Sequence, residues 1–419
     1  MSRLAGPRSE SSGGVPARSP ARIPSNSAGN RLRDRRPLRP QYLSRRKETV
    51  ISSMAQRSGG STATGRTRRQ VLVALGGVGL AGVAGCSGDG RANSPSGTTA
   101  AGASTVADEP ATSERGLADT MTIFHAGSLS PPFGAAEPDF EDEYDVAVNR
   151  EAKGSVASTQ KITEQGRPAD VLGVSDFRLI RDRIVPEYGD WYTIFTTNAM
   201  SIQYREDSPG AEEITADNWW EILGRDEVTI GHSDPAVDPG GYRAVMMLKL
   251  GKTAFDGERL YGEDTYQKMR DNTIVPTGTE TNLYGQLEAG GKLDYAIYYQ
   301  SISSQNDLPW ITLQPEVDLS MATTEYAEHY AKATVETASG DFTGAPIAYG
   351  MTVPTVAEAP ERGAQWVEFF GSDAGRTLLE NKGLQPVDPI VVPQDGADAV
   401  PDRVRAVAEP KQTLGPMNL

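Results

Sequence analysis

The chain has 419 residues, a net charge of −15 and a single cysteine, so it is long enough for two or three domains with an internal cleft and contains no internal disulfide bond. Residues 1–69 carry 16 Lys and Arg against 3 Asp and Glu, which leaves 25 against 53, a net charge of −28, for the remainder. This acidic remainder argues against a nucleic-acid partner, because Lys and Arg neutralise the phosphates in such complexes, and it is typical of the solvated surfaces of halophilic proteins.

Residues 1–53 are rich in Arg, Pro and Ser and show no apolar periodicity. Such a segment buries too little apolar surface to offset the entropy lost on ordering, so we predict that it is disordered. Met54 is an alternative start of translation, and in that case residues 1–53 are not part of the protein.

Residues 54–86 have the pattern of an export signal. Arg68 and Arg69 form a twin arginine, a weakly apolar run of 14 residues follows at 71–84, and AGC ends at Cys86. The run is shorter than the ~20 residues of a membrane-spanning helix. We interpret the segment as a twin-arginine signal that closes in a lipoprotein box, whose cysteine becomes the lipidated first residue. The alternative is a buried core helix.

A lipidated Cys86 would leave no thiol for catalysis, because it is the only cysteine. The next segment, 87–118, is rich in Ser, Gly, Thr and Ala, a composition typical of flexible linkers. We therefore predict a globular body that is anchored by lipid to the extracellular face of the cell membrane.

The body begins near Asp119 and alternates strands with helices. Strands are predicted at 121–127, 146–152 and 169–175, with helices at 131–144 and 155–166 after the first two. A second series has helices at 218–223, 240–250 and 280–291 and strands at 228–233 and 293–301, and a strand at 346–354 and helices at 362–371 and 373–383 come last. This alternation predicts an α/β fold with largely parallel sheets.

Two Gly-Ser pairs stand between a predicted strand and the following helix, at Ser128 in FHAGSLSPPF and at Ser155 in EAKGSVAST. Serine is a good helix N-cap, so capping explains both. The other explanation is that the hydroxyls and the N–H groups of Ser128 and Leu129 bind an anion. Because ligands of α/β folds bind at the carboxyl ends of parallel strands, the two pairs would contribute to one site.

Two carboxylates stand near helix starts in the second series, Asp238 in SDPAVDPGGYR and Glu280 in GTETNL. Asp followed by Pro is usual where a helix begins, and a carboxylate there complements the helix dipole. Sequence spacing does not separate capping from ligand binding. Arg243 is nearby, and pairing with an acidic neighbour is at least as good an explanation for it as ligand binding.

Other candidate sites are less well supported. LKLGKTAF has Met246 where a phosphate-binding loop needs Gly. The three histidines, His125, His232 and His329, lack metal-ligand spacing, and nothing around Ser128 resembles a nucleophile elbow. We expect His125 to be a satisfied loop or core residue.

Seven motifs carry a family resemblance: FHAGSL, EAKGSV, ADVLGVSD, SDPAVDPGGYR, ETNLYGQLEAG, LDYAIYYQS and PIAYGMTVP. In this order, over residues 120–389, the chain resembles the tungstate/molybdate-binding receptors of ABC importers, the archaeal relatives of bacterial molybdate-binding proteins. The resemblance implies a two-lobed periplasmic-binding-protein fold of the second type with two hinge crossovers. Lobe 1 would comprise residues 119–203 and 345–400, and lobe 2 would comprise residues 204–344.

The resemblance also implies a ligand site between the lobes. Lobe 1 would contact the oxyanion through Ser128, the Leu129 amide and Ser155. Lobe 2 would contribute Asp238, Pro239, Gly240, Glu280 and Tyr299. At Gly240, where some members of the family have Cys, only a backbone contact is possible. Asp238 and Glu280 would coordinate the metal atom of the oxyanion directly, and Thr281 is the alternative to Glu280.

Direct coordination would explain why carboxylates face a dianion. Two like unit charges ~4 Å apart cost ~4 kcal/mol at an effective dielectric constant near 20. Tungsten(VI) and molybdenum(VI) accept further oxygen donors that offset this cost, whereas the sulfur of sulfate does not, and sulfate would be rejected.

The sequence therefore predicts an exported lipoprotein, not an enzyme, that captures tungstate or molybdate. It would pass the oxyanion to a permease powered by a separate ATPase. We expect a monomer without a cofactor. The alternatives are a sulfate or phosphate receptor of the same fold and a cell-surface hydrolase that uses Ser128 or Ser155.

Overall fold

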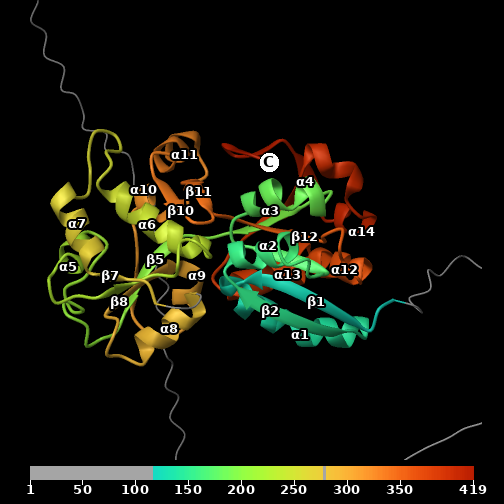
Figure 1. Ribbon diagram of the computed structural model, residues 1–419, viewed down its shortest axis with the longest axis horizontal. Helices are drawn as coiled ribbons and strands as arrows, with labels where there is room; N and C mark the ends of the chain where they lie inside the picture. Colours follow the sequence, from blue (N-terminus) through green and yellow to red (C-terminus); the bar gives the residue numbers. More distant parts are fainter. Residues whose placement is uncertain (1–116, 277–279) are drawn as a thin grey trace, which may run out of the picture. The chain divides into compact units, whose positions relative to one another are not determined.

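The computed structural model describes residues 117–276 and 280–419 (Figure 1). The predictions for the extension 1–53, the export signal 54–86 with its lipidated Cys86, and the linker up to residue 116 lie outside these residues. Among the helices of the described part, none has the length and apolar character of a membrane span.

The first lobe is built on a seven-stranded sheet with the strand order β14-β13-β4-β12-β3-β1-β2. Its strands are β1 (Thr120–Ala126), β2 (Ala147–Lys153), β3 (Val171–Val174), β4 (Thr193–Thr197), β12 (Ala348–Thr352), β13 (Gln385–Pro393) and β14 (Ala408–Lys411). The predicted strands at 121–127, 146–152 and 169–175 correspond to β1, β2 and β3, which are parallel to one another. Strand β12 returns between β3 and β4 and is antiparallel to both.

Helices pack on this sheet and bury its apolar side chains. They are α1 (Ser130–Tyr144), α2 (Ser155–Thr163), α3 (Arg178–Arg183), α4 (Val185–Tyr188), α12 (Pro360–Gly371), α13 (Asp373–Asn381) and α14 (Asp402–Arg405), with the 3-10 turns η1 (Gly127–Leu129) and η2 (Gln394–Ala399). Phe133 and Phe140 of α1 meet Trp366 of α12 edge to face, with ring centroids 5.3 and 4.9 Å apart. Such aromatic contacts add to the hydrophobic gain of burial and fix α1 against α12.

The second lobe is built on a five-stranded sheet with the order β7-β6-β8-β5-β9. Its strands are β5 (Met200–Tyr204), β6 (Ile230–Gly231), β7 (Thr273–Ile274), β8 (Tyr295–Tyr299) and β9 (Trp310–Thr312). Its helices are α5 (Trp219–Leu223), α6 (Pro239–Gly251), α7 (Glu263–Asp271), α8 (Glu280–Glu288), α9 (Gln300–Ser303), α10 (Pro315–Asp318) and α11 (Thr324–Tyr330). Every residue of β8 is buried, as expected for a strand covered on both faces.

Two hairpins lie outside the two main sheets. Strands β10 (Thr334–Thr337) and β11 (Gly340–Thr343) form a hairpin that packs on α6. Strands β15 (Thr413–Leu414) and β16 (Met417–Asn418) form the second hairpin. The C-terminus lies beside α3 (Figure 1), where the Arg181 guanidinium donates to the Asn418 carbonyl over 3.0 Å.

The chain crosses between the two sheets twice, as the predicted two-lobed fold requires. The first crossing is Asn198–Ala199, between β4 and β5, and the second is the segment 344–347, between β11 and β12. The predicted limit between residues 203 and 204 therefore differs from the structure, because β5 pairs with β8 and β9 of the second sheet. The first lobe also extends beyond residue 400, since β14 pairs with β13.

Candidate functional site

Three serines lie where neighbouring strands of the first lobe end. Ser128 follows β1 in η1, Ser155 follows β2 as the first residue of α2, and Ser175 follows β3. Because β1 is parallel to both β2 and β3, the three serines share one edge of the sheet. All three are fully buried. The sequence predicted the first two at this edge and missed Ser175.

The hydroxyls of Ser128 and Ser155 do not cap helices. Neither α1 nor α2 has a side-chain hydrogen bond at its N-cap. Ser128 Oγ instead accepts from the hydroxyl of Tyr349 over 3.0 Å. Ser155 Oγ accepts from the backbone N–H of Ser175 over 3.0 Å and lies 3.1 Å from Ser175 Oγ. Capping therefore does not explain why serine occupies these two positions.

Asp238, by contrast, does cap a helix. Its Oδ1 accepts from the backbone N–H of Gly240 over 3.1 Å, and Pro239 is the first residue of α6. This is the usual chemistry of a helix start. Asp238, Pro239 and Gly240 are all buried. A capping role does not by itself exclude a ligand role for Asp238.

The backbone before α2 touches the backbone before α6. A Cβ atom built on Gly154 would lie 2.2 Å from the Val237 carbonyl oxygen and 3.0 Å from Asp238 Cβ. The backbone N–H of Ala157 donates to the same carbonyl over 3.3 Å. Glycine at position 154 therefore allows the two lobes to meet, and it places Ser155 beside Asp238.

Tyr299, at the end of β8, joins the second lobe to these serines. Its hydroxyl donates to Ser175 Oγ over 3.3 Å and accepts from Arg243 Nη1 over 2.6 Å. Its ring lies edge-on to Tyr349, with centroids 5.8 Å apart. Since Tyr349 donates to Ser128, hydrogen bonds and ring contacts link all the serine and tyrosine side chains of the cluster.

Glu280 is the first residue of α8. Its side chain and that of Thr281 lie outside the described residues, so the structure does not test either as a ligand. Helix α8 packs against η1, and the helix that begins at Glu280 is therefore a neighbour of Ser128 and Leu129.

A charged cluster that the sequence did not predict lies behind Ser175. The Asp176 carboxylate pairs with Arg178 Nη2 over 2.6 Å and with Arg243 Nη2 over 3.2 Å, and it accepts from the Tyr242 hydroxyl over 2.7 Å. Burial alone would raise the pKa of Asp176, but the two guanidinium groups hold it below its usual value. The pairing of Arg243 with an acidic neighbour, one of the two explanations considered from the sequence, is confirmed.

His125 is a core residue, as expected, but only one ring nitrogen has a partner. Nδ1 lies 2.8 Å from the Ala126 carbonyl, whereas Nε2 has no hydrogen-bond partner among the described residues. The ring packs against Phe133, with centroids 5.2 Å apart. Burial lowers the pKa of His125 to about 4.

This pKa predicts a loss of stability in acid. The unfolded chain takes up a proton at His125 near pH 6.5, whereas the folded protein resists protonation down to about pH 4. The contribution is therefore complete above pH 6.5 and is lost as the pH falls to about 4, by up to roughly 3 kcal/mol. We expect His125→Gln to be less stable at pH 7 but to lose roughly 3 kcal/mol less than the wild type on acidification, measured by urea unfolding at pH 7 and pH 4. Equal losses would contradict the assignment.

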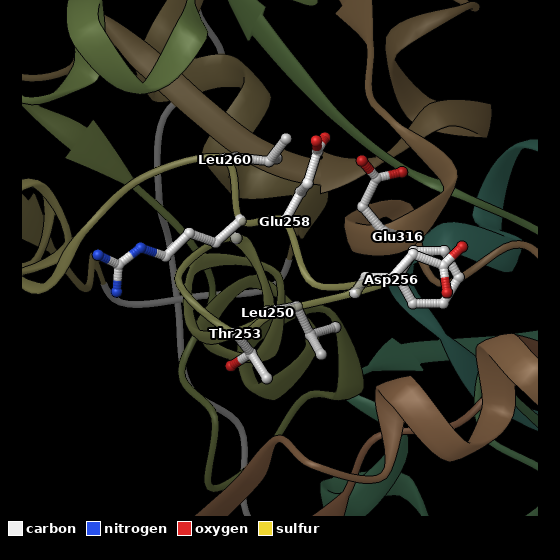
Figure 2. Close-up of a pocket in the computed structure, with 9 residues that line it drawn as sticks. Leu250, Thr253, Asp256, Glu258, Leu260 and Glu316 are labelled. Carbon is white, nitrogen blue, oxygen red and sulfur yellow. The ribbon is translucent and has the colours of Figure 1, made fainter. Parts of the chain in front are cut away.

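A separate pocket of about 310 Å³ lies at the far end of α6 (Figure 2). It is lined by Leu250, Gly251, Thr253, Phe255, Asp256, Glu258, Arg259, Leu260 and Glu316. Three of its side chains are carboxylates and one is a guanidinium, so an oxyanion would meet a net negative lining. The described residues also contain no group of three or more His, Cys, Asp or Glu arranged to hold a metal ion.

Comparison with known proteins identifies the relatives of this chain. A family described as bacterial extracellular solute-binding protein matches residues 121–385. An uncharacterized solute-binding protein of Methanoculleus marisnigri is 38% identical over 318 residues, which are 70% of this chain and 87% of the relative. The molybdate/tungstate-binding protein WtpA of Pyrococcus abyssi is 34% identical over 318 residues, 70% of this chain and 90% of that protein.

Solved structures of similar proteins include the periplasmic molybdate-binding protein of Azotobacter vinelandii, with a TM-score of 0.47, 12% identity and coverage of 63% of this chain and 98% of that chain. The sulfate-binding protein SubI of Mycobacterium tuberculosis has a TM-score of 0.46, 16% identity and coverage of 68% and 92%. The sequence relatives are solute-binding proteins and not enzymes. The chain belongs to the bacterial extracellular solute-binding protein family.

Proposed function

We propose that this solute-binding protein captures tungstate or molybdate between its lobes and delivers the oxyanion to an ABC importer. One observation supports the proposal most directly. The start of α2 at Gly154 and Ser155, on the sheet edge that also holds Ser128, lies against Val237 and Asp238 of the second lobe in a buried region. The relative named as a molybdate/tungstate-binding protein, at 34% identity, points to the same ligands.

The serine edge has the donors that the oxo groups of such an ion need. The N–H groups at the starts of η1 and α2 include those of Leu129 and Ser155, and a helix N-terminus favours negative charge. The hydroxyls of Ser128, Ser155 and Tyr299 are neutral donors. Held in this way, an oxyanion needs no Lys or Arg in direct contact.

Asp238 and Glu280 have a different role in the proposal. A carboxylate is repelled by each unit charge of a facing oxyanion by ~4 kcal/mol at ~4 Å and an effective dielectric constant near 20. A bond from carboxylate oxygen to tungsten or molybdenum offsets this repulsion, and sulfate and phosphate cannot form it. The two residues would therefore select the ligand by its central atom.

The proposed setting is the outer face of the cell membrane. In this proposal the twin-arginine signal exports the protein, lipid on Cys86 anchors it, and the acidic surface suits a salt-rich medium. The protein acts as a monomer that meets a permease with its own ATPase.

A second candidate is a sulfate or phosphate receptor of the same fold. The observation that favours it is the hydrogen bond from the Gly240 N–H to Asp238 Oδ1, which gives Asp238 a structural role without any ligand. In that case Asp238 would be a helix cap alone, and ligand selection would depend on other groups.

Isothermal titration at high salt with tungstate, molybdate, sulfate and phosphate distinguishes the two candidates. We expect tungstate and molybdate to bind on the order of a thousandfold more tightly than sulfate, the ratio that ~4 kcal/mol of uncompensated repulsion produces. Equal affinities for sulfate and tungstate would contradict coordination by carboxylates and favour the second candidate.

A further inference from the structure

Polar contacts outside the proposed ligand site join the two lobes. They are Tyr242 Oη to Asp176 Oδ2 at 2.7 Å, Arg243 Nη2 to Asp176 Oδ2 at 3.2 Å, Arg243 Nη1 to the Ser175 carbonyl at 2.7 Å, Arg178 Nη1 to the Thr343 carbonyl at 2.8 Å and Arg183 Nη2 to the Ser339 carbonyl at 2.7 Å. In each pair one residue belongs to the first lobe and the other to the second. Asp176, Tyr242 and Arg243 are almost completely buried.

The two charged groups at the centre of this network each have a partner in their own lobe. Asp176 is held by Arg178 of the following helix, with contacts of 2.6 and 2.9 Å. Arg243 donates to the hydroxyl of Tyr299 over 2.6 Å. Separation of the lobes would therefore expose a carboxylate and a guanidinium that each retain a partner. An uncompensated charge would make such a network costly to open and close, and this network avoids that cost.

The second lobe holds its part of the network rigidly. The ring of Tyr242 stacks on Phe342 of β11 with centroids 4.2 Å apart and an interplanar angle of 12°. The guanidinium of Arg183, from the first lobe, lies 5.7 Å from the centre of the Phe342 ring. The β10–β11 hairpin therefore packs against the Tyr242 ring through Phe342, and Arg183 of α3 contacts the same phenylalanine.

One helix couples this network to the proposed ligand site. Asp238 caps the first turn of α6, and Tyr242 and Arg243 follow one turn later in the same helix. A movement of α6 that brings Asp238 to the serine edge therefore brings Tyr242 to Asp176 as well. Hinge closure, with or without ligand, would therefore bring the network and the proposed ligand groups together in one movement.

We infer that Asp176, Tyr242 and Arg243 form a latch that holds the lobes closed and sets the rate of ligand release. They act as positioning residues, through closure of the lobes and not through contact with the ligand. Since ligand release presupposes an oxyanion ligand, the kinetic part of the inference rests on the proposed function. The part of the inference that concerns closure of the lobes does not rest on the proposed function.

The test uses Tyr242→Phe, which removes the hydroxyl that reaches across to Asp176 and keeps the ring on Phe342. The matched control is Tyr261→Phe, which removes a buried hydroxyl whose 2.7 Å hydrogen bond to the Leu248 carbonyl stays within the second lobe. Arg183→Met removes a second contact between the lobes at a less buried position. All are made in the full chain.

Closure is measured without ligand, as the distance between spin labels on the two lobes. The labels are placed at Glu164→Cys and Lys268→Cys, two exposed positions, in a chain with Cys86→Ser so that no other thiol reacts. We expect Tyr242→Phe and Arg183→Met to shift the distances to larger values and Tyr261→Phe to leave them unchanged. An unchanged distribution in Tyr242→Phe overturns the inference, whether or not any oxyanion binds.

Release is measured by exchange of isotopically labelled tungstate from the protein. Loss of a hydrogen bond to a buried charge should make ligand release about tenfold faster. We therefore expect tungstate to leave Tyr242→Phe about tenfold faster than it leaves the wild type, and to leave Tyr261→Phe less than twofold faster. A wild-type rate in Tyr242→Phe overturns the latch. Failure of the wild type to bind tungstate or molybdate overturns the proposed function instead, and the label distances then decide the inference.

Discussion

Replacing Gly154 by alanine is expected to weaken tungstate binding by about ten- to a hundredfold and to leave the melting temperature of the ligand-free protein nearly unchanged. The new Cβ would lie 2.2 Å from the Val237 carbonyl oxygen, which belongs to the backbone of the other lobe. Overpacking of this kind costs about 1–3 kcal/mol. The backbone of Gly154, with φ −57° and ψ 145°, is open to alanine, so the cost arises only when the lobes close. Titration calorimetry and thermal melting measure the two effects.

Gly262→Ala is the matched control for this prediction. Gly262 also precedes a helix and has an ordinary φ of −91°, but a Cβ there would meet no atom within 4 Å. We expect wild-type tungstate affinity and at most a small change in melting temperature. If Gly154→Ala binds tungstate as tightly as Gly262→Ala, the lobes do not meet at Val237 when ligand is bound.

The parts of the candidate site that could be predicted from the sequence are those that depend on neighbouring residues in the chain. Ser128 and Ser155 each follow a strand within a strand-turn-helix unit, and parallel pairing of β1 with β2 brings the two turns to one edge. Periodicity identifies such units, and the topology of parallel sheets places their ends together. The order of strands and helices up to β3 could therefore be predicted from the sequence.

The residues that sequence missed have partners far away in the chain. Tyr349 donates to Ser128 across 221 positions, and Arg243 donates to the Ser175 carbonyl across 68. Asp176 and Tyr349 stand in two of the motifs that carry the family resemblance, ADVLGVSD and PIAYGMTVP, but no local pattern predicts the partner of either residue. Only the folded chain shows that a tyrosine from β12 reaches the first Gly-Ser turn.

The lobe boundary was misplaced for a similar reason. Strands β4 and β5 are separated by two residues, Asn198 and Ala199, a spacing that is common in hairpins. Here the two strands enter different sheets. Local pattern cannot reveal this, because the two strands pair with β12 and β8, which lie far later in the chain.

Asp238→Asn tests the role of the carboxylate most directly, because the structure separates its two functions. Asparagine is as good an N-cap as aspartate and can accept from the Gly240 N–H as Asp238 Oδ1 does. We therefore expect the melting temperature without ligand to change little. Loss of a donor to the metal atom should weaken tungstate binding about a hundredfold or more, as truncating one partner of a buried charged contact does. Combination with Glu280→Gln should weaken it further.

Sulfate is expected to respond in the opposite direction. It meets the charge of Asp238 without forming a bond, so removal of that charge relieves ~4 kcal/mol of repulsion for each unit charge of the ligand, and the affinity for sulfate should rise in Asp238→Asn. Asp234→Asn is the control, since Asp234 also accepts from a nearby backbone N–H, that of Ala236 over 2.9 Å, but does not cap α6. Calorimetric titration of both variants with tungstate and with sulfate measures the change in affinity for each oxyanion. An unchanged preference for tungstate over sulfate in Asp238→Asn would mean that Asp238 is a cap alone, because a ligand-coordinating carboxylate cannot lose its charge without changing which oxyanion binds.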